Sequence, residues 1–299
     1  FDPSRHCEEH SDEAIHPLAS VVDGLLRFAR NGGPEGSSKE PPMTAYKDLT
    51  VETQGHVQIV TIRRPPFNFF DNDLIRELAA AFEAGDRDPD IRASVLASEG
   101  KSFCAGADFA NRADTGTVAE GGKHLYKEAT RLFKIEKPIV AAVHGAAIGG
   151  GLGLAVMADF RITCAEARFS ANFARLGMHP GFGLTHTLPR IVGQQQAALL
   201  FYTGRRISGE EAYRIGLADM LVPEAEVLGA AKALAAEIAQ SAPLAILSIR
   251  ETLRRGLAEG VERATERELV EQDWQRRTAA VKEGVQATAE RRLPGFRGT

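Results

Sequence analysis

The sequence has few of the features that mark secreted, membrane or nucleic-acid-binding proteins. It contains three cysteines, Cys7, Cys104 and Cys164, which are too few and too scattered for a disulfide framework, so we expect a reducing cytoplasm. No apolar run reaches the roughly 18–20 residues of a membrane helix. Basic residues number 36 against 40 acidic ones, so neither nucleic acid nor a membrane is expected as a partner.

Composition divides the chain into three parts. Residues 1–42 are polar, begin with Phe1 and end in a run rich in Gly, Ser and Pro, so we expect a flexible N-terminal extension. We hypothesise that Met43 is the native start. In residues 43–222, short apolar runs alternate with helical patterns, which predicts an α/β core, and residues 223–299 are helical by pattern.

The local patterns predict individual elements. Two short runs around Gln54-Gly55 indicate a β-hairpin, and the later alternation of strands with helices predicts crossovers and a largely parallel sheet. The expected strands are 49–52, 57–62, 93–97, 139–143 and 160–164. The expected helices are 73–84, 123–135, 150–157, 224–240, 243–256 and 261–284.

Two glycine-containing segments follow expected strands. In the first, residues 101–109, the small residues Ala105, Gly106 and Ala107 allow the backbone to approach a ligand closely. The second, residues 143–153, leads into a helix at Gly150, whose unpaired N–H groups and positive dipole end attract negative charge. The segments lack the Gly-Lys-Ser/Thr ending of a P-loop and the third glycine of a dinucleotide-binding motif. Tight packing through small residues is the alternative explanation of the triple glycine.

Taken together, Phe-Cys-Ala-Gly-Ala-Asp-Phe at 103–109 and the later Gly-Gly-Gly helix start resemble the crotonase superfamily of enoyl-CoA hydratases and isomerases. The resemblance covers about residues 46–297. Further segments that match the family pattern are Arg64-Pro65 with Asn68, 158–162, 169–183, 188–193, 203–205, 211–217 and 283–296.

The resemblance implies a spiral of ββα units with a helical C-terminal region that serves oligomerisation and pocket closure, usually in trimers or paired trimers. It implies no permanently bound cofactor, because coenzyme A arrives as part of the acyl-CoA substrate, with its adenine near the Ala105 carbonyl. The thioester oxygen would accept hydrogen bonds from the N–H groups of Ala107 and Gly150, an oxyanion hole for the developing enolate. The residues expected to contact the substrate are Phe67, Asn68, Ala105, Gly106, Asp108, Gly149, Gly153, Phe173 and Gly181.

The sequence departs from the family where proton transfer is expected. Hydratases of the superfamily use two glutamates, whose positions here hold Gly153 and Phe173, and neither residue can transfer a proton. In some relatives a catalytic aspartate matches Gly181. His179, two residues earlier, is therefore a candidate acid or base, against the alternative of a packing histidine. Asp71 is a weaker acid/base candidate, which we expect instead to cap the helix at 73–84.

Other catalytic arrangements are less well supported. Cys104 is either a nucleophile beside the site or, as we expect, a small buried residue. His179 and His186 have no close Cys, His or Asp cluster around them, so no metal site is predicted. No serine-nucleophile elbow occurs.

Three functions remain open. The first is an enoyl-CoA hydratase/isomerase-family enzyme of acyl-CoA catabolism, with standard two-glutamate hydration in doubt. The second is another enolate-forming reaction, such as acyl-CoA decarboxylation, which needs the oxyanion hole but little proton abstraction. The third is an acyl-CoA-binding protein without turnover.

Overall fold

The protein is built around a twisted, mostly parallel sheet, as seen in a computed structural model that describes residues 46–107 and 125–297. The sheet has the strand order β1-β2-β3-β4-β6-β9. Only the first pair, β1 with β2, is antiparallel, because a two-residue turn joins these strands, whereas the others are linked by crossovers. Its strands are β1 (Leu49–Gln54), β2 (Val57–Ile62), β3 (Ala93–Ser98), β4 (Ile139–Val143), β6 (Phe160–Thr163) and β9 (Met220–Leu221).

A second, smaller sheet follows from the glycine segment after β4. It has the order β5-β7-β8, with β5 (Ala146–Ile148), β7 (Arg168–Ser170) and β8 (Ile207–Ser208). Strand β5 runs directly into α4 (Gly150–Met157), whose eight residues are all buried. A helix that is apolar all round belongs in the interior of a protein, and α4 lies between the sheet and α5 (Leu184–Thr203).

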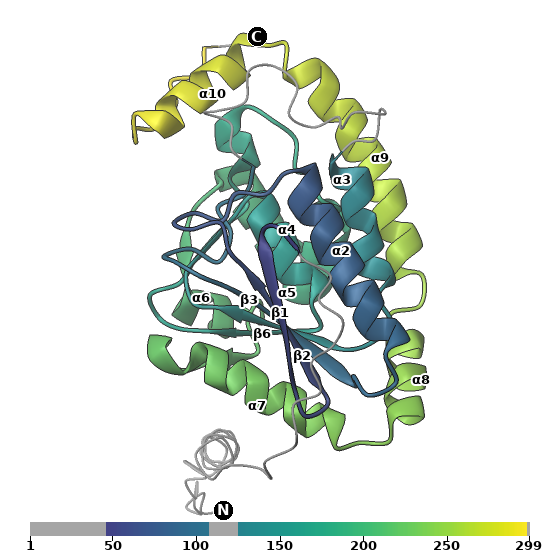
Figure 1. Ribbon diagram of the computed structural model, residues 1–299. Helices are drawn as coiled ribbons and strands as arrows, with labels where there is room; N and C mark the ends of the chain where they lie inside the picture. Colours follow the sequence, from purple (N-terminus) through teal and green to yellow (C-terminus); the bar gives the residue numbers. More distant parts are fainter. Residues whose placement is uncertain (1–45, 108–124, 298–299) are drawn as a thin grey trace, which may run out of the picture.

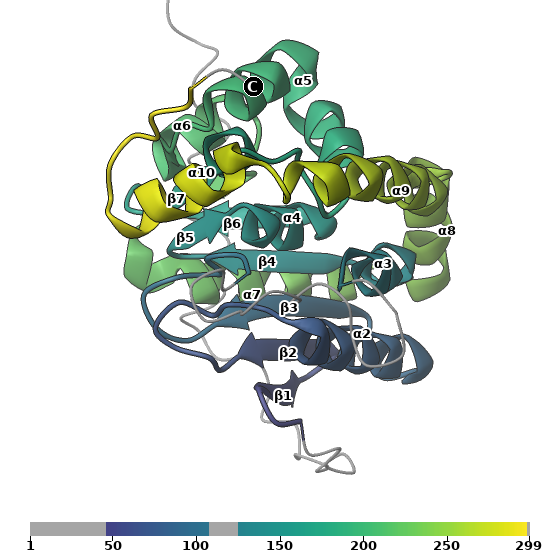
Figure 2. The ribbon, with the colours of Figure 1, turned by 90° about the horizontal axis from the view of Figure 1, so that it is seen from above.

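Helices cover both faces of the main sheet. Helix α7 (Val227–Ala239) packs on β2, β3, β4 and β6, whereas α2 (Asn72–Arg87) packs on β1 and β2 and contacts α3 (Leu125–Ala129). Figures 1 and 2 show the last helices running around the side and top of the molecule. These are α8 (Pro243–Leu253), α9 (Leu257–Gln275) and α10 (Ala279–Ala289); the remaining helical elements are η1 (Thr130–Lys134), η2 (Asn172–Leu176), α6 (Gly209–Arg214) and η3 (Glu224–Glu226).

Most of the elements expected from the sequence are confirmed, with two corrections. The helix expected at 123–135 is α-helical only to Ala129 and continues as the 3-10 helix η1. The helix expected at 261–284 is two helices, α9 and α10, which are separated at Thr278. The prediction of a mixed α/β core with a helical C-terminal region is confirmed, although α7 of that region packs directly on the sheet.

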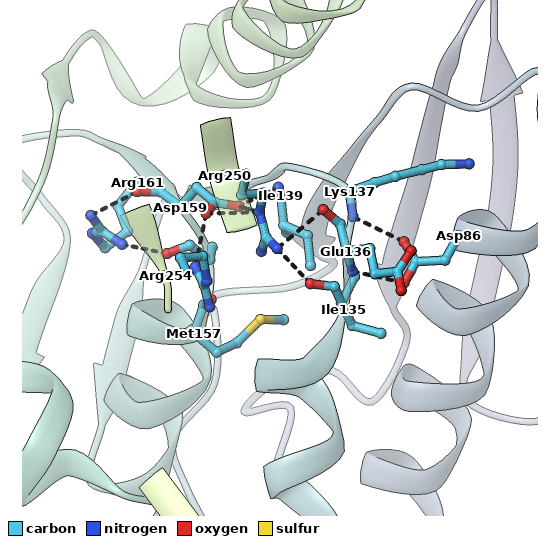
Figure 3. A network of polar contacts seen from close by, with 11 residues as sticks. Asp86, Ile135, Glu136, Lys137, Ile139, Met157, Asp159, Arg161, Arg250 and Arg254 are labelled. Carbon is cyan, nitrogen blue, oxygen red and sulfur yellow. Dashed lines mark hydrogen bonds and ion pairs between the residues drawn. The ribbon is translucent and has the colours of Figure 1, made fainter. Parts of the chain in front are cut away.

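The C-terminal region is fastened to the amino ends of β4 and β6 by a buried ionic network (Figure 3). Asp159 accepts hydrogen bonds from the backbone N–H of Ile139 at 2.8 Å, from Arg250 Nε at 3.0 Å and from Arg254 Nη1 at 2.8 Å. Arg254 also donates to the Met157 carbonyl. Asp159 directly precedes β6 and is bonded both to the first residue of β4 and to arginines of α8 and its C-cap, so it holds the helical region against the sheet.

Within residues 46–107 and 125–297, no single helix has both the length and the apolar character needed to cross a membrane. The segments Glu224–Ala239 and Pro243–Leu253 reach that length and composition only as a pair, and they are bent by 108° relative to each other.

Candidate active site

The two glycine-containing segments lie side by side at the carboxyl ends of β3 and β4. The backbone N–H of Cys104 donates to the Ala146 carbonyl at 2.9 Å, and that of Ile148 donates to the Cys104 carbonyl at 3.0 Å. These two bonds are those of a parallel bridge between Cys104 and Ala147. Main-chain hydrogen bonds therefore join two segments that are far apart in the sequence.

Gly106 lies against the start of α4 with no room for a side chain. Its φ is +87°, and a Cβ there would lie 2.8 Å from the Ile148 carbonyl oxygen and 3.7 Å from the Gly150 backbone nitrogen. Glycine is the residue that reaches this backbone conformation without steric cost. The absent side chain allows the backbone of the first glycine segment to approach the start of α4 beside the Gly150 N–H.

The N-terminus of α4 presents unpaired donors at this point. Gly149 precedes the helix with φ +57°, and its carbonyl accepts from the N–H groups of Leu152 and Gly153. Gly150 is the first helical residue, so its N–H has no partner one turn earlier in the helix. The helix dipole adds partial positive charge at the same place. A buried donor without an acceptor can stabilise an oxygen that gains negative charge.

Ala107 provides the second predicted donor. It forms a parallel bridge with Phe70, in which the Phe70 N–H donates to the Gly106 carbonyl at 3.0 Å. In a parallel pair the ladder bonds run through the neighbours of the bridged residue, so the N–H of Ala107 is not used in this pairing. No main-chain carbonyl of residues 46–107 or 125–297 accepts a bond from the N–H of Ala107 or of Gly150.

The early loop before α2 is clamped onto the first glycine segment. The side-chain amide of Asn68 is fully buried and donates to the carbonyls of Glu99 and Ser102, both at 2.7 Å. The Phe67 carbonyl accepts from the Ala105 N–H at 2.9 Å, while the Phe67 ring is 49% exposed. Asp71 caps α2 by accepting from the Leu74 N–H at 2.9 Å, as predicted. Asn68 thus has a positioning role, and Phe67 and Ala105 lie at the open side of the loop.

Aromatic rings lie at the three positions where the family resemblance implies acidic groups. A Cβ on Gly153 would lie 2.6 Å from Cγ of Phe182, and a Cβ on Gly181 would lie 2.2 Å from Cε2 of Tyr126. Phe173 is 2% exposed, and its Cζ lies 3.8 Å from where a Cβ on Gly149 would be. Aromatic carbon thus lies at positions 153, 173 and 181, and the rings of Phe182 and Phe173 lie next to α4 and the residue that precedes it.

His179 lies in a different environment from the glycine segments. It is half-buried, and its Nδ1 lies 3.0 Å from the Pro180 carbonyl oxygen. It lines a cavity of about 450 Å³ together with Met178, Phe201 and Tyr202, and none of residues 101–107 or 143–153 lines that cavity. The structure therefore brings Gly106, Ala107 and Gly150 together without His179, whose catalytic role stays a prediction.

Neither a cysteine nucleophile nor a metal site is found among the described residues around the glycine segments. Cys104 is fully buried, and burial raises the pKa of its thiol to about 12, which keeps it protonated rather than nucleophilic. Among the described residues no cluster of His, Cys, Asp and Glu is arranged to hold a metal ion. Asp108 and Cys7 lie outside the described residues.

Sequence reasoning missed Glu268 of α9, which supports the loop that carries Phe182. Its carboxylate is buried and accepts from the backbone N–H groups of Gly183, at 2.8 Å, and Thr185, at 3.0 Å. Burial raises the pKa of Glu268, although the bonds from Thr185 and Gly183 act in the opposite direction. Since its partners are more than 80 residues away in sequence, no local pattern signals this role.

Comparison with known proteins agrees with this geometry. The family model described as Enoyl-CoA hydratase/isomerase matches residues 52–299. A probable enoyl-CoA hydratase of Bacillus subtilis is 36% identical over 257 residues, covering 84% of this chain and 98% of the relative. A short-chain-enoyl-CoA hydratase of Clostridium acetobutylicum is 37% identical over 215 residues, covering 70% and 82%.

Among solved structures, an enoyl-CoA hydratase/isomerase from Pseudoalteromonas atlantica superposes with a TM-score of 0.74 at 31% identity. The match covers 84% of this chain and 100% of that one, so the crotonase-like fold expected from the sequence is confirmed. The glycine segments, their junction at the start of α4 and these matches agree: the chain belongs to the enoyl-CoA hydratase/isomerase family.

Proposed function

We propose that this protein acts on an acyl-CoA thioester and stabilises its enolate with the backbone N–H groups of Ala107 and Gly150. The observation that carries the proposal is the junction of the two glycine segments, where Gly106, which has no side chain, lies against the start of α4 next to the Gly150 N–H. An enolate places negative charge on the thioester oxygen, and fixed donors in a buried site stabilise that charge without reorganising; one such donor is typically worth about 3–4 kcal/mol. Coenzyme A enters and leaves with the acyl group, and no permanently bound cofactor is required.

The reaction that follows enolate formation differs from two-glutamate hydration. Adding water across a double bond needs a carboxylate to orient the water and an acid to protonate the α-carbon. Gly153 and Phe173 supply neither, and ring atoms of Phe182 fill the space that a side chain at position 153 would need. This observation favours decarboxylation as a second candidate. There the bond between the α-carbon and the leaving carboxylate breaks, CO₂ departs and the electron pair is held as the enolate, without prior proton abstraction.

A panel of thioesters tests the proposal with the full chain. Hydration of crotonyl-CoA, isomerisation of a 3-enoyl-CoA and decarboxylation of a malonyl-type CoA are followed separately, and binding of butyryl-CoA is measured by calorimetry. Turnover of at least one thioester with slow crotonyl-CoA hydration supports the proposal. Rapid crotonyl-CoA hydration refutes the inference drawn from Gly153 and Phe173. Tight binding of butyryl-CoA without turnover of any substrate leaves the acyl-CoA-binding protein as the correct function.

We also propose that the active form is a homotrimer or a dimer of trimers in the cytoplasm. The support is a set of large apolar side chains that are exposed on the C-terminal helices and the segment after them. These are Leu244 at 81%, Leu253 at 75%, Val270 at 60%, Trp274 at 54% and Leu293 at 73% exposed. Large apolar side chains that are exposed on neighbouring segments favour burial against another protein surface. Sedimentation equilibrium at several concentrations distinguishes a monomer from a trimer or hexamer.

A further inference from the structure

Phe182 lies in the loop before α5 in a conformation that aromatic residues rarely adopt. Its φ is +66°, and its ring is 1% exposed. A left-handed backbone costs a bulky residue free energy, so the surrounding contacts must impose it. One such contact is the bond from the N–H of the next residue, Gly183, to the buried carboxylate of Glu268. The fold therefore holds the Phe182 ring at a defined place.

That place is the face of α4 that begins at the predicted oxyanion donor. Gly150 and Gly153 are three residues apart and share one helix face. Cζ of Phe70 would lie 2.3 Å from a Cβ on Gly150, and Cγ of Phe182 would lie 2.6 Å from a Cβ on Gly153. The centroids of the two rings are 5.8 Å apart. Together the rings cover the first turn of α4, and Phe182 covers its inner part.

We infer that Phe182 determines acyl-group specificity by closing the site, beyond the thioester, to all but short apolar acyl chains. The inference rests on the proposed function, which places the thioester oxygen at Gly150. An acyl chain that extends along α4 from Gly150 meets the Phe182 ring at Gly153. The Phe182 ring also packs against the rings of Tyr126 and Phe133, whose centroids lie 5.9 and 6.3 Å from its own.

The same packing sets the polarity of the accepted chain. Phe70 and Phe182, which cover the face of α4 at Gly150 and Gly153, offer no hydrogen-bonding group there, and both residues are 1% exposed. A hydroxyl or carboxylate that an acyl chain carries beyond its β-carbon would lose its water there without gaining a partner, which is unfavourable. The accepted class is thus a CoA thioester of a short acyl chain with no polar group beyond the β-carbon.

The test is a binding series with saturated thioesters, which need no turnover. Affinities for coenzyme A, butyryl-CoA, hexanoyl-CoA and octanoyl-CoA are measured by calorimetry for the native chain and for Phe182→Gly, because glycine accepts the positive φ while removing the ring. Phe133→Ala, which removes a neighbouring ring of the same cluster, is the matched control. Phe182→Leu, which keeps an apolar side chain of smaller size, serves if the glycine variant does not fold.

The native protein is expected to bind octanoyl-CoA no more tightly than butyryl-CoA. In Phe182→Gly, each additional buried methylene should strengthen binding about fourfold, the equivalent of about 0.8 kcal/mol, so octanoyl-CoA should gain at least tenfold over butyryl-CoA. Phe182→Leu should show a smaller gain and Phe133→Ala less than a twofold change.

The outcomes separate the inference from the function on which it rests. If folded Phe182→Gly or Phe182→Leu keeps the native chain-length profile, or if Phe133→Ala shifts it equally, Phe182 does not determine specificity even though thioesters bind. If butyryl-CoA binds no more tightly than coenzyme A in every variant, the acyl group is not held at this site and the proposed function fails as well.

Discussion

The two ends of strand β4 have opposite chemistry. At its amino end, the charged side chains of Asp159, Arg250 and Arg254 are largely buried and bonded to one another and to main-chain atoms (Figure 3). At its carboxyl end, the chain turns through glycines into α4, and aromatic rings lie at positions where the family resemblance implies carboxylates.

The contrast indicates how the chain uses buried polarity. Side-chain charges at the amino end hold α8 to the sheet, whereas polarity at the carboxyl end comes from main-chain donors. Ligands of parallel sheets commonly bind beyond the carboxyl ends of the strands. Backbone donors tolerate any side chain around them, so the proposed enolate stabilisation does not require a carboxylate at position 153 or 173. The ionic end should therefore respond to substitution in stability, and the glycine end in turnover.

Asp159→Ala should have the largest effect, and it should be on stability. The substitution leaves the buried guanidinium groups of Arg250 and Arg254 without their carboxylate partner and the Ile139 N–H without an acceptor. Breaking a buried ion pair from one side typically costs about 3–5 kcal/mol. Urea denaturation monitored by circular dichroism measures the loss. Glu251→Gln, which removes an exposed partner of Arg255 on the same helix, is the control and should cost less than about 1 kcal/mol. Equal losses in the two variants would remove the proposed distinction.

Among substitutions of a glycine by alanine, Gly106→Ala should lower turnover the most. The new Cβ would lie 2.8 Å from the Ile148 carbonyl oxygen and 3.7 Å from the Gly150 backbone nitrogen, at a residue whose φ is +87°. Loss of an oxyanion donor lowers kcat by about 10²–10³-fold, and we expect a decrease of that size for the preferred thioester. Gly55→Ala provides the matched control, because Gly55 has φ +58° and no atom within 4 Å of the added Cβ. Its backbone strain should reduce stability and leave kcat unchanged; similar kcat values for both variants would exclude the assigned position of the oxyanion.

Gly153→Ala tests whether the aromatic filling of the glycine end is rigid. The added methyl group would lie 2.6 Å from Cγ and 2.7 Å from Cβ of Phe182, and such overpacking typically costs about 1–3 kcal/mol. The double variant with Phe182→Gly should recover part of that loss, with a coupling energy of about 0.5–3 kcal/mol in a double-mutant cycle from urea denaturation. Gly229→Ala in α7, where an added Cβ meets no atom within 4 Å, should not destabilise the protein. Additive losses at positions 153 and 182 would show that the ring moves aside freely.

The contrast between the two ends also separates what sequence could and could not predict. The β1–β2 hairpin, strand β4 and the start of α4 follow from local patterns, and the two glycine segments indicated their own junction through the family resemblance. The filling of the space at Gly153 by Phe182 depends on the third dimension, because a glycine in a sequence does not state which ring covers it. The Glu268 support was likewise hidden, since its bond to Gly183 joins residues 85 apart. The 3-10 helix η1 shows how local helical spacing can be retained while the hydrogen-bond pattern changes.

Glu268→Gln should have the smallest effect, visible as a change in pH dependence. Because burial raises the pKa of Glu268 above its ordinary value of 4.5, the folded state binds the proton more tightly than the unfolded state does. The corresponding stability is present below pH 4.5 and is lost as the pH rises through the folded-state pKa, by about 1.4 kcal/mol for each pH unit that separates the folded-state pKa from the unfolded-state pKa. The difference in unfolding free energy, native minus Glu268→Gln, should therefore decrease between pH 4 and the folded-state pKa.

Urea denaturation at intervals between about pH 4 and pH 8 measures that difference, and comparing the two proteins at each pH cancels the groups that they share. Glu266→Gln, at an exposed position of the same helix, controls for the removal of one negative charge from α9. The amide that Glu268→Gln introduces can still accept one of the loop's hydrogen bonds, so a constant offset reports the lost acceptor and the slope reports the proton. A difference that increases with pH would mean that the bonds from Gly183 and Thr185 outweigh burial. Hydrogen bonds would then stabilise a charged carboxylate behind the Phe182 loop, and the two ends of the sheet would share the same use of buried charge.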